Sequence, residues 1–352
     1  MRRRGWIAAT LGLLLLSAWL SSLADSRPAT TARAPVQFPT SARRAEYDRM
    51  RARRTLAVRT PVVAAAAGDE EPEKKKRDPF LVALPARADD PVLVFEANAL
   101  RHSRLGELFV RCMLAKDPKA FEKAEQEIGI DVLKDVDRVA FVGQAVVVSG
   151  FFKGLRTEQL QHETGAPPER YGESGILYAP DAGPASEHTV VGTWRDQLVV
   201  FAGEASTVRR AFDQLEGRAT PAPIDLPDEI AYGEAYGVIP GEAVRRLLRN
   251  DSGLLADRLA AAASRIELHV DAMQDIAAVA RFRGADASAL ADLGRAMGGV
   301  LAGARLQAQV SGDKVLADLL DQASVVPGDG RFSVQVALPM DRVEAWFADC
   351  GR

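Results

Sequence analysis

Cysteine is scarce in this sequence, and its scarcity limits the chemistry that the chain can support. Only Cys112 and Cys350 occur among 352 residues. Two thiols cannot form a metal site made of cysteine alone. In an oxidising compartment they form a possible disulfide, for which a single intramolecular pairing exists. Two unpaired thiols remain the alternative, because separation along the sequence does not fix the distance between Cα atoms.

Histidine is also rare, and recognised catalytic or cofactor signatures are missing. No pair of histidines has the spacing of metal ligands on a helix, and the sequence has no Walker A loop or dinucleotide-binding fingerprint. Gly298, Gly299 and Gly303 fall within a predicted helix, where they favour close helix packing or a kink over phosphate binding. We therefore assign no cofactor, metal ligand or catalytic residue. The four histidines are His102, His162, His188 and His269.

Two local patterns invite a chemical interpretation, and each has a simpler one. Ser311-Gly-Asp-Lys314 matches the Ser-x-x-Lys pattern of penicillin-recognising enzymes, but the partner motifs are absent and a helix N-cap accounts for Ser311. A hairpin loop between two aspartates has the oxygen atoms to hold a cation, but a polar loop is the simpler and favoured explanation. The clusters of oxygen-bearing side chains to inspect are Glu96 with Asn98, and Asp271 with Asp275.

Charge is distributed unevenly along the chain. The first ninety residues hold 17 basic and 10 acidic side chains, whereas residues 91–352 hold 28 basic and 38 acidic ones. An acidic body argues against a nucleic-acid partner, because phosphate binding needs a basic face. The basic head is better explained by membrane topology.

The N-terminus has the features of an export segment. Arg2, Arg3 and Arg4 precede an uncharged run from Gly5 to Ala24, which is long enough to cross a bilayer of about 30 Å as a helix. Arginines at its start are typical of the cytoplasmic side. Small residues at Ser22 and Ala24 also fit cleavage after Ala24. The sequence therefore predicts either a retained membrane anchor or a signal peptide, with the rest of the chain extracytoplasmic.

Residues 25–90 have the composition of a disordered linker. They are rich in Ala, Pro, Thr and Arg and show little apolar periodicity, so they cannot bury enough surface to offset chain entropy. A Pro-rich break at 219–227 divides the remainder. We expect a signal peptide or anchor at 1–24, the linker at 25–90, and α+β domains at 91–218 and 228–352.

Apolar periodicity predicts the same order of elements in both domains. With extras removed, each reads strand, helix, strand, strand, helix, strand, which is the ferredoxin-like βαββαβ order with an antiparallel sheet covered by helices on one face. The predicted strands are 91–96, 138–142, 145–153, 175–178, 189–194, 197–202, 230–239, 265–270, 276–283 and 332–338. The predicted helices include 103–113, 156–162, 204–215, 240–249, 254–263, 286–322 and 342–347.

Residues 129–217 resemble a pattern found in uncharacterised exported bacterial proteins. The similarity lies in Gly129 to Val139, in Tyr171-Gly with Ile176-Leu-Tyr178, in Asp196 to Val200, and in Leu215-Glu-Gly217. It covers about a quarter of the chain. The resemblance implies an α+β domain outside the cytoplasm and assigns no functional residue.

These features favour a membrane-tethered or secreted binding or structural protein. Its expected partners are the membrane, through the N-terminal helix, and other envelope proteins or the cell wall. An envelope hydrolase with an unrecognised site and a carrier of lipid or another apolar ligand remain the alternatives.

Overall fold

Two compact units make up the described part of the chain. The computed structural model describes residues 79–348, except 117–118, 120, 123–124, 127–128, 180–188, 222–223, 225, 228–229, 249–253 and 329. Unit 1 contains the described residues of 89–120 and 225–348, and unit 2 contains those of 79–88 and 121–224. The predicted membrane segment lies outside the described residues, within which no helix is long and apolar enough to cross a bilayer.

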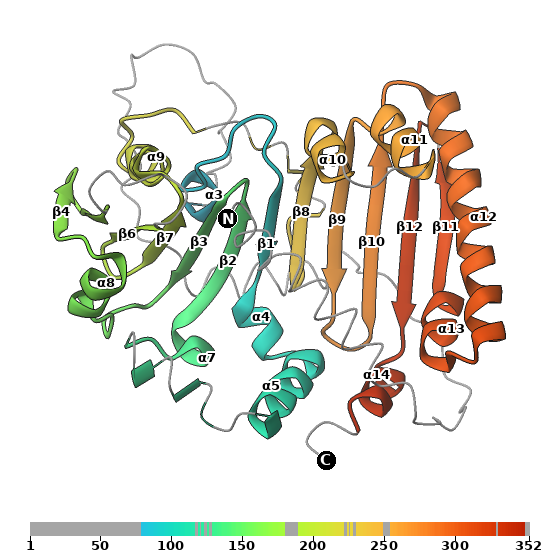
Figure 1. Ribbon diagram of the computed structural model, residues 1–352, viewed down its shortest axis with the longest axis horizontal. Coiled ribbons are helices and arrows are strands. Elements are labelled where there is room, and N and C mark those ends of the chain that lie inside the picture. Colours follow the sequence, from blue (N-terminus) through green and yellow to red (C-terminus); the bar gives the residue numbers. More distant parts are fainter. Residues whose placement is uncertain are drawn as a thin grey trace, which may run out of the picture. The chain divides into compact units, whose positions relative to one another are not determined.

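The sheet of unit 1 joins a strand from early in the sequence to five from the C-terminal part. Strand β1 (Val92–Phe95) pairs antiparallel with β8 (Ala235–Pro240), so a segment that lies between the two parts of unit 2 in the sequence belongs to unit 1. All the strand pairs are antiparallel (Figure 1). The spatial order is β1, β8, β9 (Arg265–Asp271), β10 (Ile276–Arg283), β12 (Arg331–Leu338) and β11 (Ala323–Gly328).

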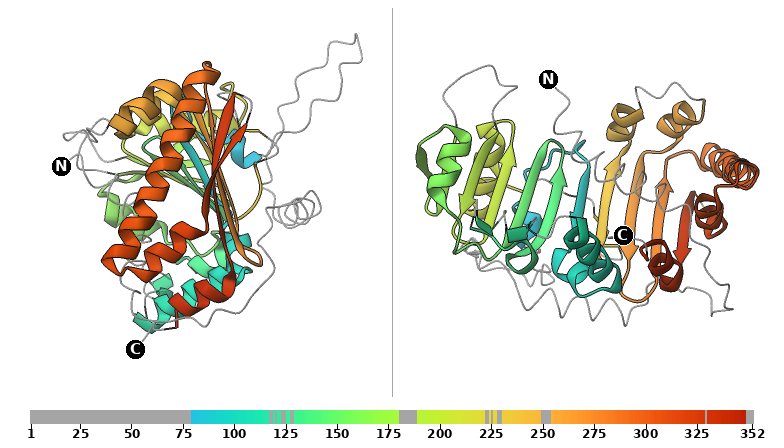
Figure 2. Two further views of the ribbon diagram at one scale, coloured as in Figure 1. Left: turned by 90° about the vertical axis from the view of Figure 1, so that its right-hand side faces the viewer. Right: turned by 60° about the horizontal axis from the view of Figure 1, so that its bottom comes forward.

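Helices cover one face of this sheet, as Figure 2 shows from the side. Strand residues that alternate towards the helices, among them Ile266, Phe282 and Phe332, form an apolar cluster with Leu290 and Leu293 of α12. The rings of Phe282 and Phe332 stack with their centroids 4.5 Å apart. The helices of this unit are α4 (Ala97–Arg101), α5 (Arg104–Lys116), α10 (Gly241–Leu248), α11 (Leu254–Ala262), α12 (Ala287–Ser311), α13 (Lys314–Asp321) and α14 (Met340–Trp346).

Unit 2 contains six antiparallel strands, four of which form a meander. The spatial order is β2 (Val136–Val142), β3 (Ala145–Gly150), β7 (Leu198–Ala202), β6 (Val190–Trp194), β5 (Gly175–Tyr178) and β4 (Pro168–Tyr171). Helix α9 (Ala205–Leu215) buries Val208 and Phe212 against it, where a side chain at Gly192 would collide with both. The remaining helices are α3 (Pro79–Val82), α7 (Val132–Asp135) and α8 (Thr157–Thr164).

The α+β class, the antiparallel sheets and most of the predicted elements are confirmed, but the ferredoxin-like strand order is wrong. That order places the first and second strands of each unit apart and parallel, with the third between them. In unit 1, β8 and β9 are instead direct antiparallel neighbours, and β9 is followed by β10 and β12. Element order alone does not determine which strands pair, because a helical connection can return to a neighbouring strand in either direction.

Three local predictions also change. The helix predicted over 286–322 is two helices, because Gly312 ends α12 in the left-handed region at φ 75° and Asp313 caps α13. The strand predicted from 230 begins at Ala235. Strands β4 and β11 were not predicted, since their polar and Pro/Gly-containing sequences lack strand periodicity.

Candidate functional site

Arginines gather on the face of the unit 1 sheet that points away from the helices. Arg265, Arg283 and Arg331 lie directly opposite one another on β9, β10 and β12. Arg281 lies two residues along β10, opposite Glu267 of β9. Alternate residues of a strand point to the same face, so these side chains share one face. We call Arg265, Glu267, Arg281, Arg283 and Arg331 the arginine face.

Glu267 is the buried acid of the arginine face. Its side chain is fully buried, and its Oε1 lies 2.6 Å from Nη2 of Arg265 and 2.7 Å from Nε of Arg283. A buried carboxylate needs such partners, because an uncompensated charge in a protein interior is costly. Within the described residues, Arg281 and Arg331 form no ion pair. The face therefore keeps an excess of positive charge after its internal pairs are counted.

His269 follows the arginine face along β9 and is buried. Its Nδ1 lies 3.4 Å from the carbonyl oxygen of Ile230, and the centroid of its ring is 4.4 Å from that of Tyr232. Burial lowers the pKa of His269 to about 4, and the positive charge of Arg281 acts in the same direction. His269 is therefore neutral at pH 7.

Carboxylates lie at the ends of β1, β8 and β9. The hydroxyl of Tyr236 donates a hydrogen bond of 2.7 Å to Oε1 of Glu96, and the backbone N–H of Ala272 donates one of 2.6 Å to Oε2 of Glu234. Glu96, Glu234 and Asp271 are all buried. These hydrogen bonds link neighbouring strand ends. Glu96 and Asn98, which the sequence groups together, have different partners, because Oδ1 of Asn98 accepts a hydrogen bond from Arg101.

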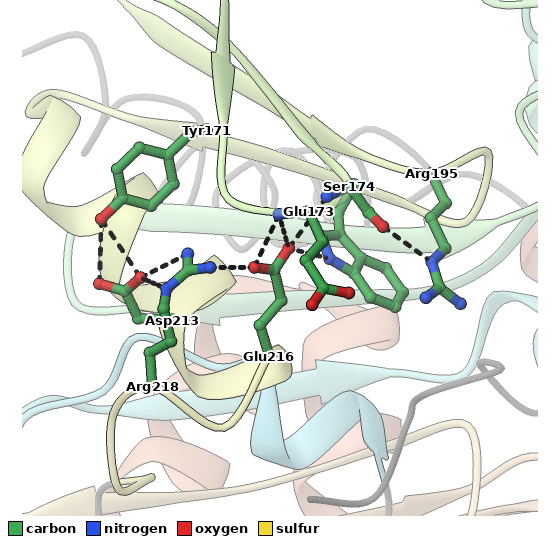
Figure 3. A network of polar contacts seen from close by, with 8 residues as sticks. Tyr171, Glu173, Ser174, Arg195, Asp213, Glu216 and Arg218 are labelled. Carbon is green, nitrogen blue, oxygen red and sulfur yellow. Dashed lines mark hydrogen bonds and ion pairs between the residues drawn. The ribbon is translucent and has the colours of Figure 1, made fainter.

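Unit 2 has a polar network of a different kind, centred on Glu216 (Figure 3). The carboxylate follows helix α9 and accepts hydrogen bonds from the backbone N–H groups of Glu173 and Ser174 at 3.0 and 3.1 Å. It also accepts one from Nε1 of Trp194 at 3.4 Å and is paired with Arg218. Burial raises the pKa of Glu216, but these hydrogen bonds and the charge of Arg218 outweigh burial, so its pKa is lowered.

Gly172 allows Glu216 to reach the turn between β4 and β5. Its φ is +66°, and a Cβ at this position would lie 2.3 Å from Oε2 of Glu216. Glycine is the residue that adopts this conformation without strain and leaves the space open. The Gly172-Glu-Ser-Gly175 turn therefore binds an internal carboxylate through its backbone.

Arg218 connects Glu216 to a second acid in the same network. Its Nε donates a hydrogen bond of 2.8 Å to Asp213 of α9, and the hydroxyl of Tyr171 donates one of 3.1 Å to the same carboxylate. Burial and then the neighbouring Asp213 raise the pKa of Tyr171. The contacts of Glu216 with Glu173 and Ser174, and of Asp213 with Tyr171, join the β4–β5 hairpin to the end of α9, so the arrangement explains how the meander is held in place.

The histidines and aspartates that the sequence analysis singles out lie on separate elements. His102 Nδ1 lies 2.7 Å from the carbonyl oxygen of Asn98, and His162 is exposed on α8. Asp275 Oδ1 accepts from the backbone N–H of Met340, at the start of α14, and Asp271 Oδ1 from that of Met273. His188 lies outside the described residues. Within residues 79–348, the described His, Cys, Asp and Glu form no group arranged to hold a metal ion.

Ser311 and the helical glycines differ from their predicted roles. Ser311 is the last residue of α12, where its hydroxyl donates to the carbonyl oxygen of Ala308, and Asp313 supplies the N-cap of α13. A Cβ at Gly298, Gly299 or Gly303 would meet no described atom within 4 Å. Close packing within the described chain therefore does not explain these three glycines.

Cys112 is buried beside the C-terminal helix. It forms an apolar cluster with Val343, Trp346 and Phe347, at 2% exposure. Cys350 lies outside the described residues. The disulfide between Cys112 and Cys350 therefore stays a prediction.

An open groove of about 960 Å³ lies on the helical side of unit 1, among α10, α11 and α12. Alanine side chains and Leu293 form much of its lining, and Arg245, Arg258 and Arg295 supply positive charge. Arg245 is paired with Glu242 and Arg295 with Asp292. The groove combines apolar surface with arginine, as a site for an amphiphile does.

Sequence reasoning did not find the arginine face or the Glu216 network. The arginine face depends on which strands are neighbours, and the wrong strand order hid it. A usable signal was present in Arg265-Ile-Glu267 and Arg281-Phe-Arg283, where charged residues alternate with apolar ones at the period of a strand. The Glu216 network includes Tyr171, Gly172 and Glu216, which belong to the pattern shared with exported proteins.

Comparison with known proteins finds a weak similarity to a solved structure. No protein-family model matches this chain. No curated protein matches it either. Among solved structures, crystal form I of TP0453 is similar at a TM-score of 0.41 and 14% sequence identity, over 81% of this chain and 98% of that one. This likeness is too weak to carry an argument about function.

Proposed function

We propose that this protein is exported and binds an anionic partner outside the cytoplasm. The N-terminal segment supports the export: three arginines precede twenty uncharged residues, and this pattern is typical of a membrane anchor or signal peptide. A retained anchor holds the protein at the membrane through the segment between Ala24 and α3. Cleavage after Ala24 releases it to the periplasm or the medium.

The arginine face is the observation that carries the binding role. Four arginines and one buried glutamate lie together on one side of a sheet in a body whose net charge is negative. Such a local excess of charge attracts ligands of opposite sign. Anionic components of the envelope, at the membrane or in the cell wall, have the matching charge.

The groove in unit 1 favours a second candidate, a carrier of an amphiphilic ligand. Alanine and leucine side chains offer a surface for an acyl chain, while Arg258 offers a charge for an anionic head. Organic extraction of the purified protein, followed by mass spectrometry, tests this candidate. A bound amphiphile that is lost in an Ala289→Trp variant supports it, and an extract without one contradicts it.

Fractionation of cells tests the export. We expect the full-length chain in the membrane or extracytoplasmic fraction, and a variant that lacks residues 1–24 in the cytosol. A cytosolic pool of the full-length chain contradicts the proposal. A free-thiol count on denatured, unreduced protein tests the disulfide in the same samples: none is expected after export, and two mean that Cys112 and Cys350 are unpaired.

A further inference from the structure

The spacing of the arginine face determines what it can bind. Neighbouring strands lie about 4.8 Å apart, and residues directly opposite each other have Cβ atoms about 5 Å apart. Arg265, Arg283 and Arg331 occupy one such row across three strands, and Arg281 lies beside it. Like charges placed directly opposite destabilise a sheet. An anion bound to this row of three arginines would therefore reduce the repulsion between them.

Glu267 provides part of that relief from its position beside the row on β9. Its fully buried carboxylate holds Arg265 and Arg283, whose side chains are 21% and 33% exposed. Both guanidinium groups are thus held by this carboxylate while part of each side chain remains exposed. Arg331 is exposed and Arg281 is half-buried, and neither forms an ion pair within the described residues.

We propose that the arginine face binds a ligand through a phosphate group with three free oxygens, such as a phosphomonoester or the end of a pyrophosphate chain. The planar guanidinium fork binds oxyanions through paired hydrogen bonds. A carboxylate has two oxygens, and Glu267 already shows one joined to two arginines. A terminal phosphate has three oxygens and up to two charges, so it can engage three arginines together. The proposal rests on the proposed function only in taking this face as a binding surface.

In this site Glu267 is a positioning residue, and the ligand contacts are Arg281, Arg331 and the exposed part of Arg283. His269 and Asp271 follow Glu267 along β9 and are buried. His269 is neutral at pH 7, because burial lowers its pKa to about 4, and it adds no positive charge to the face. The binding strength should therefore depend mainly on the arginines and on the charge of the phosphate.

Titration calorimetry of the full-length chain with sodium tripolyphosphate tests the proposal. We expect the doubly substituted variant Arg281→Gln/Arg331→Gln to bind about tenfold or more weakly than the unsubstituted chain, because charge-assisted hydrogen bonds are lost. A matched variant, Arg111→Gln/Lys314→Gln, removes the same charge from exposed positions on α5 and α13 of unit 1 and should bind within about twofold of the unsubstituted chain. Absence of binding by the unsubstituted chain, or equal weakening in both variants, overturns the proposal. Thermal unfolding confirms that both variants are folded.

Two further arms identify the ligand class and its source. Polyglutamate is the carboxylate probe: equally tight binding that needs Arg281 and Arg331 removes the preference for phosphate but leaves the face as an anion-binding surface. Phosphatidylcholine vesicles containing phosphatidic acid present a phosphomonoester at a membrane, and those containing phosphatidylglycerol present a diester. Arginine-dependent binding to phosphatidic acid and tripolyphosphate supports a lipid source, and binding to tripolyphosphate alone supports a soluble or polymeric one. Equal binding to both vesicle types contradicts the requirement for three free oxygens.

Discussion

The two units use charged side chains in different ways. In unit 2, Glu216 is held by backbone N–H groups more than forty residues earlier in the chain, and the contacts fix a hairpin against a helix. In unit 1, charged side chains lie on neighbouring strands, and they form a row across the sheet. The first arrangement fully engages its central acid. The second leaves two arginines unpaired within the described residues, and this difference separates a structural network from a binding surface.

Removing the carboxylate of Glu216 should have the largest effect. Glu216→Ala is expected to lower the free energy of unfolding by about 3 kcal/mol, because two backbone N–H groups, Trp194 and Arg218 lose a charged partner. Glu216→Gln should cost less, since one oxygen remains to accept the backbone hydrogen bonds. Urea unfolding followed by tryptophan fluorescence measures both. Equal loss in the two variants would show that the charge, and not the hydrogen-bond acceptor, stabilises the turn.

Acid should distinguish the units through His269. Its pKa is about 4 in the folded protein and 6.5 in the unfolded chain, so the unfolded state binds more protons between these values. Stability should therefore fall as the pH drops from about 6.5 to 4, by roughly 3 kcal/mol in total. His269→Gln should flatten this dependence, and His162→Gln, at an exposed position, should not. The lowered pKa of Glu216 gives a further loss only at more acidic pH.

Gly172 tests whether the turn in unit 2 is built around its carboxylate. Gly172→Ala should lower the free energy of unfolding by about 2–3 kcal/mol, through left-handed strain and the collision with Glu216. Gly165 is the matched control, because its φ is +68° and nothing lies within 4 Å of a Cβ there. Gly165→Ala should cost about 1 kcal/mol, from strain alone. Similar losses in chemical denaturation would mean that the turn can shift away from Glu216.

The glycines of α12 provide the smallest expected effect. Gly303→Ala should stabilise unit 1 by up to about 1 kcal/mol, because alanine is the better helix former and the space is open. Gly294→Ala should gain less or destabilise, since its Cβ would lie 3.2 Å from the ring of Phe332. Thermal unfolding compares the two. Destabilisation by Gly303→Ala would show that this helix face is covered by a part of the molecule beyond the described residues.

The sequence predicts individual elements much better than their arrangement. A helix is predicted over 103–113, and the hydroxyl of Ser103 caps it by accepting from the backbone N–H of Gly106. Strands are predicted over 138–142 and 145–153, and the two residues between them form the turn that joins β2 and β3, with Gly143 at φ 56°. These are local properties, set by residues three or four positions apart. The pairing of β1 with β8 joins residues about 140 positions apart. The residues of either strand alone do not identify the strand with which it pairs.

The candidate sites follow the same division. Glu96 was singled out with Asn98, but its hydrogen-bond partner is Tyr236 on a distant strand. The arginine face needs the register of three strands, which periodicity does not provide. The turn that holds Glu216 includes the Tyr171-Gly pair of the resemblance to exported proteins, but its role depends on α9, whose end brings Glu216 to the turn.

The alternation of apolar and ionisable side chains along β9 also favours one strand register in the unit 1 sheet. Ile266 and Leu268 face the helices, whereas Glu267, His269 and Asp271 face the other way. A register shift of one residue would exchange the two sets of side chains. It would bury three ionisable groups in the apolar core beneath α12. The desolvation of these three groups therefore disfavours a misaligned sheet, so the polar side of β9 helps to specify the native register.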